Sequence, residues 1–274
     1  MNGSKFSHLF FALAVVSLGA RQIQAQPLTS TGELLASPRA PAGQPLPADV
    51  DARFIGALYG FRDSVYESAP PDEVEKAAQD LIRATKSRAL TELDRYLILA
   101  RIEYLAGRSW NEAGDKKKAI PHFEAAMDNA RLSMESGEHP AGLMAHMKPL
   151  SELCLLKDMG YLIANGPKIS QNARKVLAME PGRPGAVIVL AEAKAYPPAI
   201  FGGNPKEAIA RLTALIDARD EGFEKDDLFD LRACVATALS KLGRADEARF
   251  WFQAALELYP RNNYAASELK KAKP

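Results

Sequence analysis

The side chains best suited to binding chemistry lie on one face of a predicted helix. The face is formed by Arg101, Tyr104, Arg108 and Asn111. Successive members are three or four residues apart, which places them on the same side of a helix. Guanidinium groups bind carboxylates bidentately, and tyrosine and asparagine add directional donors. The face therefore suits a peptide terminus or an acidic small solute. The alternative is a solvated face on which the arginines pair with Glu103 or Glu112.

A second group of possible ligands lies between residues 134 and 147. It comprises Met134, His139, Met144, His146 and Met147. Thioether with imidazole is the ligand set that favours copper(I) in an exported protein. The interval between Met144 and Met147 is equally typical of methionines that fill a helical core, and His139-Pro140 is typical of a turn. We expect no metal and no other cofactor, with copper as the alternative.

No arrangement of residues typical of an active site is found in the sequence. His122, His139 and His146 lack the spacing of zinc ligands. Gly202-Gly203 lacks the following Lys and Ser or Thr of a nucleotide-binding loop. Three acidic residues close together are better explained by the start of a helix than by acid and base catalysis. They are Asp226, Asp227 and Asp230. We therefore expect a binding protein and not an enzyme.

The two cysteines, Cys154 and Cys234, both fall on apolar faces of predicted helices. A disulfide would require two rigid helices to bring their Cα atoms within about 7 Å. We favour buried free thiols, with a disulfide as the alternative in an exported protein.

Helices must position all these side chains. Beyond Asp49, apolar residues recur at steps of three and four, without the alternation of strands. The expected helices span 51–67, 72–87, 91–111, 115–135, 141–164, 168–179, 185–196, 205–219, 226–242, 245–258 and 262–272. Prolines mark several ends, including Pro181, Pro260 and the pair Asn204-Pro205.

Small and large residues recur in these helices at intervals of five, four and three. The three copies are Gly114, Ala119, Phe123 and Ala126; Gly203, Ala208, Leu212 and Leu215; and Gly243, Ala248, Phe252 and Ala255. The glycine permits a tight turn, the alanine lets two backbones approach, and the large residue fills the gap. Such a hairpin cannot bury its own apolar face, so hairpins must stack.

This pattern resembles the tetratricopeptide repeat (TPR) family. The resemblance covers 100–133, including Gly107 and Trp110, and 229–262, including the terminal Pro260. It is partial at 185–219 and poor at 140–181. It implies an all-α fold, an irregular right-handed superhelix of TPR-like hairpins over 49–274. In such a superhelix the first helices line a concave groove, where the resemblance places the Arg101 face together with Thr237 and Lys241.

The connection over 196–205 inserts extra residues between two paired helices. Its notable residues are Tyr196, Pro198, Phe201, Gly202 and Gly203. It resembles a connection in exported bacterial TPR proteins, some of which are similar to the helical-repeat T-component of tripartite (TRAP) solute transporters. We expect a structural corner whose aromatic side chains pack on the next repeat, with a ligand-facing loop as the alternative.

The N-terminus has the pattern of an export signal. Lys5 precedes an apolar run over 9–20, and a small residue, Ala25, stands at a plausible cleavage point. We predict a signal peptide over 1–25, a flexible Pro- and Ala-rich leader over 26–48, and a periplasmic or secreted protein without a membrane span after signal removal. An uncleaved anchor is the alternative.

Composition and charge narrow the function further. The 274 residues are 47% hydrophobic and 25% charged, with a formal net charge of +1. This balance gives no general attraction to nucleic acid or an anionic membrane. We expect a protein partner in the cell envelope, such as a solute-binding transporter subunit. An enclosed pocket around Tyr104 and Arg108 would indicate solute capture, whereas an exposed apolar patch would indicate a protein adaptor.

Overall fold

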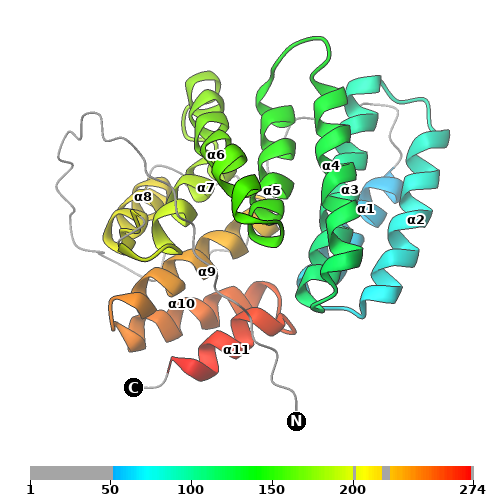
Figure 1. Ribbon diagram of the computed structural model, residues 1–274. Helices are drawn as coiled ribbons and strands as arrows, with labels where there is room; N and C mark the ends of the chain where they lie inside the picture. Colours follow the sequence, from blue (N-terminus) through cyan, green and yellow to red (C-terminus); the bar gives the residue numbers. More distant parts are fainter. Residues whose placement is uncertain (1–51, 200–201, 218–222, 273–274) are drawn as a thin grey trace.

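The regular secondary structure is helical throughout residues 52–199, 202–217 and 223–272, which are the residues that the computed structural model describes (Figure 1). The helices are α1 Ala52–Tyr66, α2 Pro71–Ser87, α3 Glu92–Glu112, α4 Lys116–Ser133, α5 Pro140–Leu156, α6 Met159–Met179, α7 Pro184–Ala195, α8 Pro205–Asp217, α9 Lys225–Lys241, α10 Ala245–Leu258 and α11 Asn263–Lys271. The expected signal peptide, the leader and Phe201 lie outside the described residues.

The helices pack in chain order as hairpins. α3 packs on α4 and α9 packs on α10, the two segments in which the repeat pattern is clearest. Alternate helices also touch, α3 with α5 and α7 with α9, so the first helices of successive hairpins lie side by side. The predicted all-α array of helical hairpins is confirmed.

The repeated residues form the hairpin cores as expected. Ala119, Phe123, Ala248 and Phe252 are completely buried. At Gly107 of α3, a Cβ would lie 2.8 Å from two ring carbons of Phe123, so a glycine is needed there for the ring to reach the opposing backbone.

The repeat glycines serve different purposes. Gly114 and Gly243 have φ of +85° and +72° in open space, so they permit a left-handed turn without any close approach. In the copy of the pattern that includes Gly203, the residue with left-handed backbone is Gly202, with φ of +84°. A Cβ at Gly203 would instead overlap the carbonyl oxygen of Pro197. Equating Gly203 with Gly114 and Gly243 is therefore wrong by one residue.

The helix boundary expected near residue 165 is also wrong. α5 ends at Leu156, and α6 begins at Met159 after Asp158, whose Oδ1 accepts a 2.9 Å hydrogen bond from the backbone N–H of Tyr161. This cap fixes the helix start. Pro167 lies inside α6, where its ring nitrogen cannot donate to the carbonyl of Ile163, and Ile163 is on the exposed surface of the helix.

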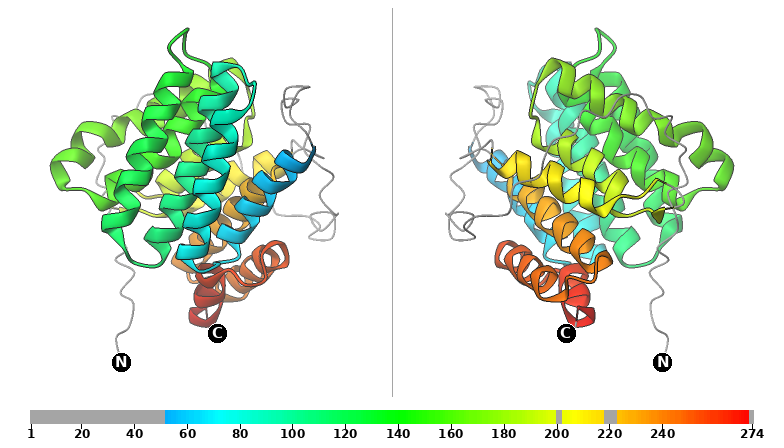
Figure 2. Two further views of the ribbon diagram at one scale, coloured as in Figure 1. Left: turned by 90° about the vertical axis from the view of Figure 1, so that its right-hand side faces the viewer. Right: turned by 90° about the vertical axis from the view of Figure 1, so that its left-hand side faces the viewer.

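The two ends of the array meet. The ring of Tyr66, at the end of α1, stacks on Tyr259 with centroids 4.9 Å apart and meets Phe229 edge-on at 5.4 Å. Asn262 Nδ2 donates a 2.7 Å hydrogen bond to the carbonyl of Tyr66. Figure 2 shows α1 beside the C-terminal helices. The first helix thus closes the array against its last hairpins.

Candidate functional site

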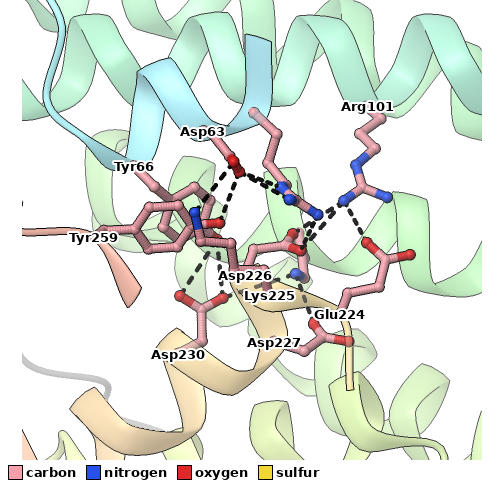
Figure 3. A network of polar contacts seen from close by, with 11 residues as sticks. Asp63, Tyr66, Arg101, Glu224, Lys225, Asp226, Asp227, Asp230 and Tyr259 are labelled. Atoms are coloured by element: carbon pink, nitrogen blue, oxygen red, sulfur yellow. Dashed lines mark hydrogen bonds and ion pairs between the residues drawn. The ribbon is translucent and has the colours of Figure 1, made fainter. Parts of the chain in front are cut away.

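Polar side chains of α1, α3 and α5 converge on the start of α9 (Figure 3). We call the side of the array on which these residues lie the inner side. Arg101 Nη2 of α3 lies 2.5 Å from Glu224 Oε2 and 3.2 Å from Asp226 Oδ2. Arg62 Nη1 of α1 lies 3.6 Å from the other oxygen of Asp226. The buried Asp226 carboxylate therefore joins α9 to both α1 and α3.

Burial and neighbouring charges set the pKa values of Asp226 and Asp227. Burial raises the pKa of the Asp226 carboxyl, but the positive charges of Arg101, Lys148 and Arg62 outweigh burial and lower it to about 2. Burial raises the pKa of the adjacent Asp227 to about 6 despite Lys148. Both carboxyls lie in the first turn of α9, where the helix dipole favours negative charge.

A second set of contacts surrounds Asp230, one turn further along α9. Arg108 Nη1 is 3.6 Å from Asp230 Oδ1 and its Nε is 2.8 Å from Glu112 Oε1. Lys148 Nζ of α5 is 3.8 Å from Asp230 Oδ2, and the Tyr66 hydroxyl donates to the same oxygen at 3.2 Å. Asp230 thereby links α9 to α3 and α5 through charged groups and to α1 through the neutral hydroxyl of Tyr66.

The structure brings the Arg101 face to the inner side, where its polar groups already contact the chain itself. The alternative pairing of Arg108 with Glu112 is present, whereas Arg101 pairs with α9 and not with Glu103. The ring of Tyr104 packs near Phe123 with centroids 6.0 Å apart. Asn111 Nδ2 donates to Glu152 Oε2 at 3.0 Å. Ligand binding by this face stays a prediction.

The other two predicted groove residues also have internal partners. Thr237 Oγ1 lies 2.9 Å from the hydroxyl of Tyr264. Lys241 Nζ donates to the carbonyl oxygen of Tyr196. The contacts tie α9 to α11 and to the end of α7, and a ligand role for them likewise stays a prediction.

The described part of the 196–205 connection is a tight corner. Gly203 N donates to the carbonyl of Pro198 at 3.0 Å, and Gly202 N donates to that of Ala199 at 3.0 Å. Asn204 N reaches back to the carbonyl of Lys194 at 2.8 Å. These bonds favour the structural-corner interpretation of the loop.

Two further carboxyl groups of the inner side make no ion pair with any residue that the structure describes. Burial raises the pKa of Glu152 to about 7 and that of Glu192 to about 8. Positive charge only partly opposes the effect of burial, from Arg108 at Glu152 and from Lys148 and Arg108 at Glu192. Burial therefore favours the neutral, protonated form of both carboxyls.

The copper alternative loses a ligand in the structure. His139 caps α5, because its Nδ1 accepts a 3.1 Å hydrogen bond from Gly142 N, and its Nε2 lies 3.1 Å from the carbonyl of Ser133. Across the described ranges, no group of three or more His, Cys, Asp and Glu side chains could hold a metal ion. Cys154 and Cys234 are buried free thiols, as the sequence favoured.

A hollow on the protein surface was not predicted from the sequence. It measures about 310 Å³, lies between α4, α5 and α6, and is lined by Glu124, Met127, Asp128, Leu153, Lys157 and Tyr161. The adjoining ends of α5 and α6 expose three apolar side chains, Leu155, Met159 and Ile163, to 40%, 53% and 65%. We call these three residues the α5–α6 corner. The apolar spacing predicts one helix over 141–164 that includes these three residues. It therefore does not predict that they lie at the junction of two helices.

Within the described residues, no helix is both long enough and apolar enough to span a bilayer. No protein-family model matches the chain. No curated protein matches it either. Among solved structures, the chain is similar to a thermophilic TPR protein of Thermus thermophilus, at 14% identity and a TM-score of 0.49 over 80% of this chain and 98% of that one. The all-α array of hairpins is evident from the helix contacts of this chain alone.

Proposed function

We propose that this chain is an exported, non-enzymatic adaptor that binds a protein partner in the cell envelope. The observation that carries the proposal is the α5–α6 corner. Large apolar side chains in solvent favour protein contact, particularly when they are contiguous and bordered by polar residues. Leu155 lies in the last turn of α5, Met159 and Ile163 lie in the first two turns of α6, and the polar residues Lys157 and Asp158 stand between the two helices.

Solute capture on the inner side has less support. Arg101 and Arg108, the groups suited to an acidic ligand, each hold two carboxylates of the chain itself. A solute would have to displace these ion pairs and leave a buried carboxylate without its partner, which is costly. Contact with the exposed side chains of the α5–α6 corner displaces none of these ion pairs.

We propose a location outside the cytoplasm because residues 1–25 have the sequence pattern of an export signal. Within the envelope, the resemblance of the 196–205 connection makes a solute-binding transporter subunit the first partner to test. Fractionation of cells that express the full chain with a C-terminal tag should recover it outside the cytoplasm. Recovery in the cytoplasm alone would overturn this part of the proposal.

The binding surface is tested by site-specific photo-crosslinking in cells. A photoreactive residue at position 163 should give a discrete crosslinked protein, and the combined substitution Met159→Ser with Leu155→Ser should reduce its yield by about tenfold. The matched control is Leu93→Ser on α3, a similarly exposed leucine away from the corner. Equal loss with Leu93→Ser, or no loss with the corner variant, would contradict the assignment.

A further inference from the structure

The hollow beside the corner already holds a basic group of the chain itself. Lys157 follows the last residue of α5, and its Nζ lies 2.5 Å from Glu124 Oε1 and 4.7 Å from the centroid of the Tyr161 ring. Proteins often recognise a cation by placing a carboxylate and the face of an aromatic ring next to it. The side chain of Lys157 nevertheless keeps 27% of its surface exposed, so it lies at the mouth of the hollow.

A second carboxylate lines the hollow. Asp128 lies one helical turn after Glu124 on α4 and is exposed. Among the described residues, its side chain makes neither an ion pair nor a hydrogen bond. Among the charged residues that line the hollow, Lys157 compensates Glu124, and the charge of Asp128 is left uncompensated.

The interior of the hollow is partly apolar. Leu153 is completely buried and, with Met127, contributes the apolar part of the lining. The hydroxyl of Tyr161 lies 3.9 Å from the sulfur of Met127. The aliphatic stem of a long basic side chain can pack on such a surface while its charged end stays at the carboxylates.

We propose that this hollow receives a lysine or arginine side chain of the protein partner, and that the partner segment combines this basic residue with apolar residues that cover the α5–α6 corner. The inference rests on the proposed function and names the chemistry of the partner. Charge complementarity supports it, because the hollow offers two carboxylates and one internal ammonium. Lys157 then acts as a competitor that the partner's basic group must displace.

The test uses the purified full chain and two synthetic peptides. The basic probe is acetyl-Leu-Lys-Leu-Leu-Lys-Leu-amide, and the acidic probe has Glu in place of both Lys. Fluorescence anisotropy should give saturable binding of the basic probe alone. Asp128→Asn should weaken that binding about fivefold, whereas the control Glu135→Gln, an exposed carboxylate just beyond α4, should leave it unchanged.

Lys157→Gln gives the sharper test. Removal of the internal ammonium should tighten binding of the basic probe several-fold, because the probe no longer has to displace it. A merely structural role of Lys157 predicts the same or weaker binding. Unfolding curves for all three variants should remain within about 1 kcal/mol of the wild type, since the affected pair is largely exposed.

The outcomes separate this inference from the proposed function. Equal binding of both probes, or no effect of Asp128→Asn and Lys157→Gln, overturns the basic-residue inference. If crosslinking at position 163 persists in that case, the adaptor proposal stands. Self-association detected by light scattering and abolished by Asp128→Asn would make a second copy of this chain the occupant and would also overturn the inference as stated.

Discussion

The imidazole Nδ1 of His122 lies 2.7 Å from Oε2 of Glu103, so α4 and α3 are joined through a charge-assisted contact. The opposite nitrogen, Nε2, lies 2.9 Å from Oε2 of Glu75 on α2. The same Glu75 oxygen accepts a 2.9 Å hydrogen bond from the indole of Trp110. One histidine thereby links three successive helices.

This linkage predicts a pH dependence of stability. The hydrogen bond to Glu103 outweighs burial and raises the pKa of His122 above its ordinary value. The stabilisation is therefore fully present below the unfolded pKa of about 6.5 and is lost as the pH rises through the folded-state pKa. Urea unfolding between pH 6 and 9 should show a free energy of unfolding that falls over this range.

The control for that pH dependence is His122→Gln. Glutamine can still donate a hydrogen bond but does not titrate, so the decline above pH 6.5 should be smaller in the variant. Identical pH profiles for the two proteins would contradict the role assigned to His122.

Three carboxylates lie at the start of α9, namely Glu224, Asp226 and Asp227. Removing the charge of Asp226 should destabilise the array more than removing the charge of either of the others. Asp226→Asn leaves Arg101 and Arg62 facing a neutral group in a buried position. We expect the free energy of unfolding to fall by about 3 kcal/mol, as is typical when one partner of a buried ion pair is lost. Asp246→Asn, an exposed aspartate on α10, should change it by less than about 0.5 kcal/mol.

Two glycine substitutions should have opposite effects. Gly203→Ala drives a methyl group into the Pro197 carbonyl and should cost about 1–3 kcal/mol. Gly56→Ala, in α1 with nothing within 4 Å, should stabilise by about 0.5–1 kcal/mol through helix propensity. Thermal unfolding followed by circular dichroism measures both, and a shared sign would contradict the contrast.

The cysteines should be unreactive in the folded protein. Burial raises the pKa of the Cys154 thiol to about 11, and burial also raises the pKa of the Cys234 thiol well above its ordinary value. A thiol reagent at pH 8 should therefore react slowly with native protein and rapidly with both thiols in urea. An absence of reaction in urea without reductant would indicate a disulfide.

Local patterns predicted the helices better than they predicted their contacts. Apolar spacing gave most helix bounds to within a few residues. It misplaced the α5–α6 boundary because Asn165-Gly166-Pro167 is typical of a break, whereas the cap at Asp158 is a single side-chain hydrogen bond. The glycine register at 202–203 likewise depends on contact with Pro197, which spacing does not encode.

The candidate site could be predicted only in part. The interval pattern placed Arg101 and Arg108 on one face, and both do reach the inner side. The spacing did offer the local pair of Arg108 with Glu112 as an alternative, and that pair is present. The partners near the start of α9 lie more than a hundred residues away in the sequence, so no local pattern could indicate them. The α5–α6 corner depended on a boundary that the sequence misplaced.

The closure of α1 on the C-terminal hairpins has a consequence for folding order. Tyr66 and Asp63 meet partners that lie 164 to 196 positions later in the chain. Such long separations raise contact order and slow the final docking step. A nascent chain leaving the ribosome cannot complete this docking until its last helices have been synthesised.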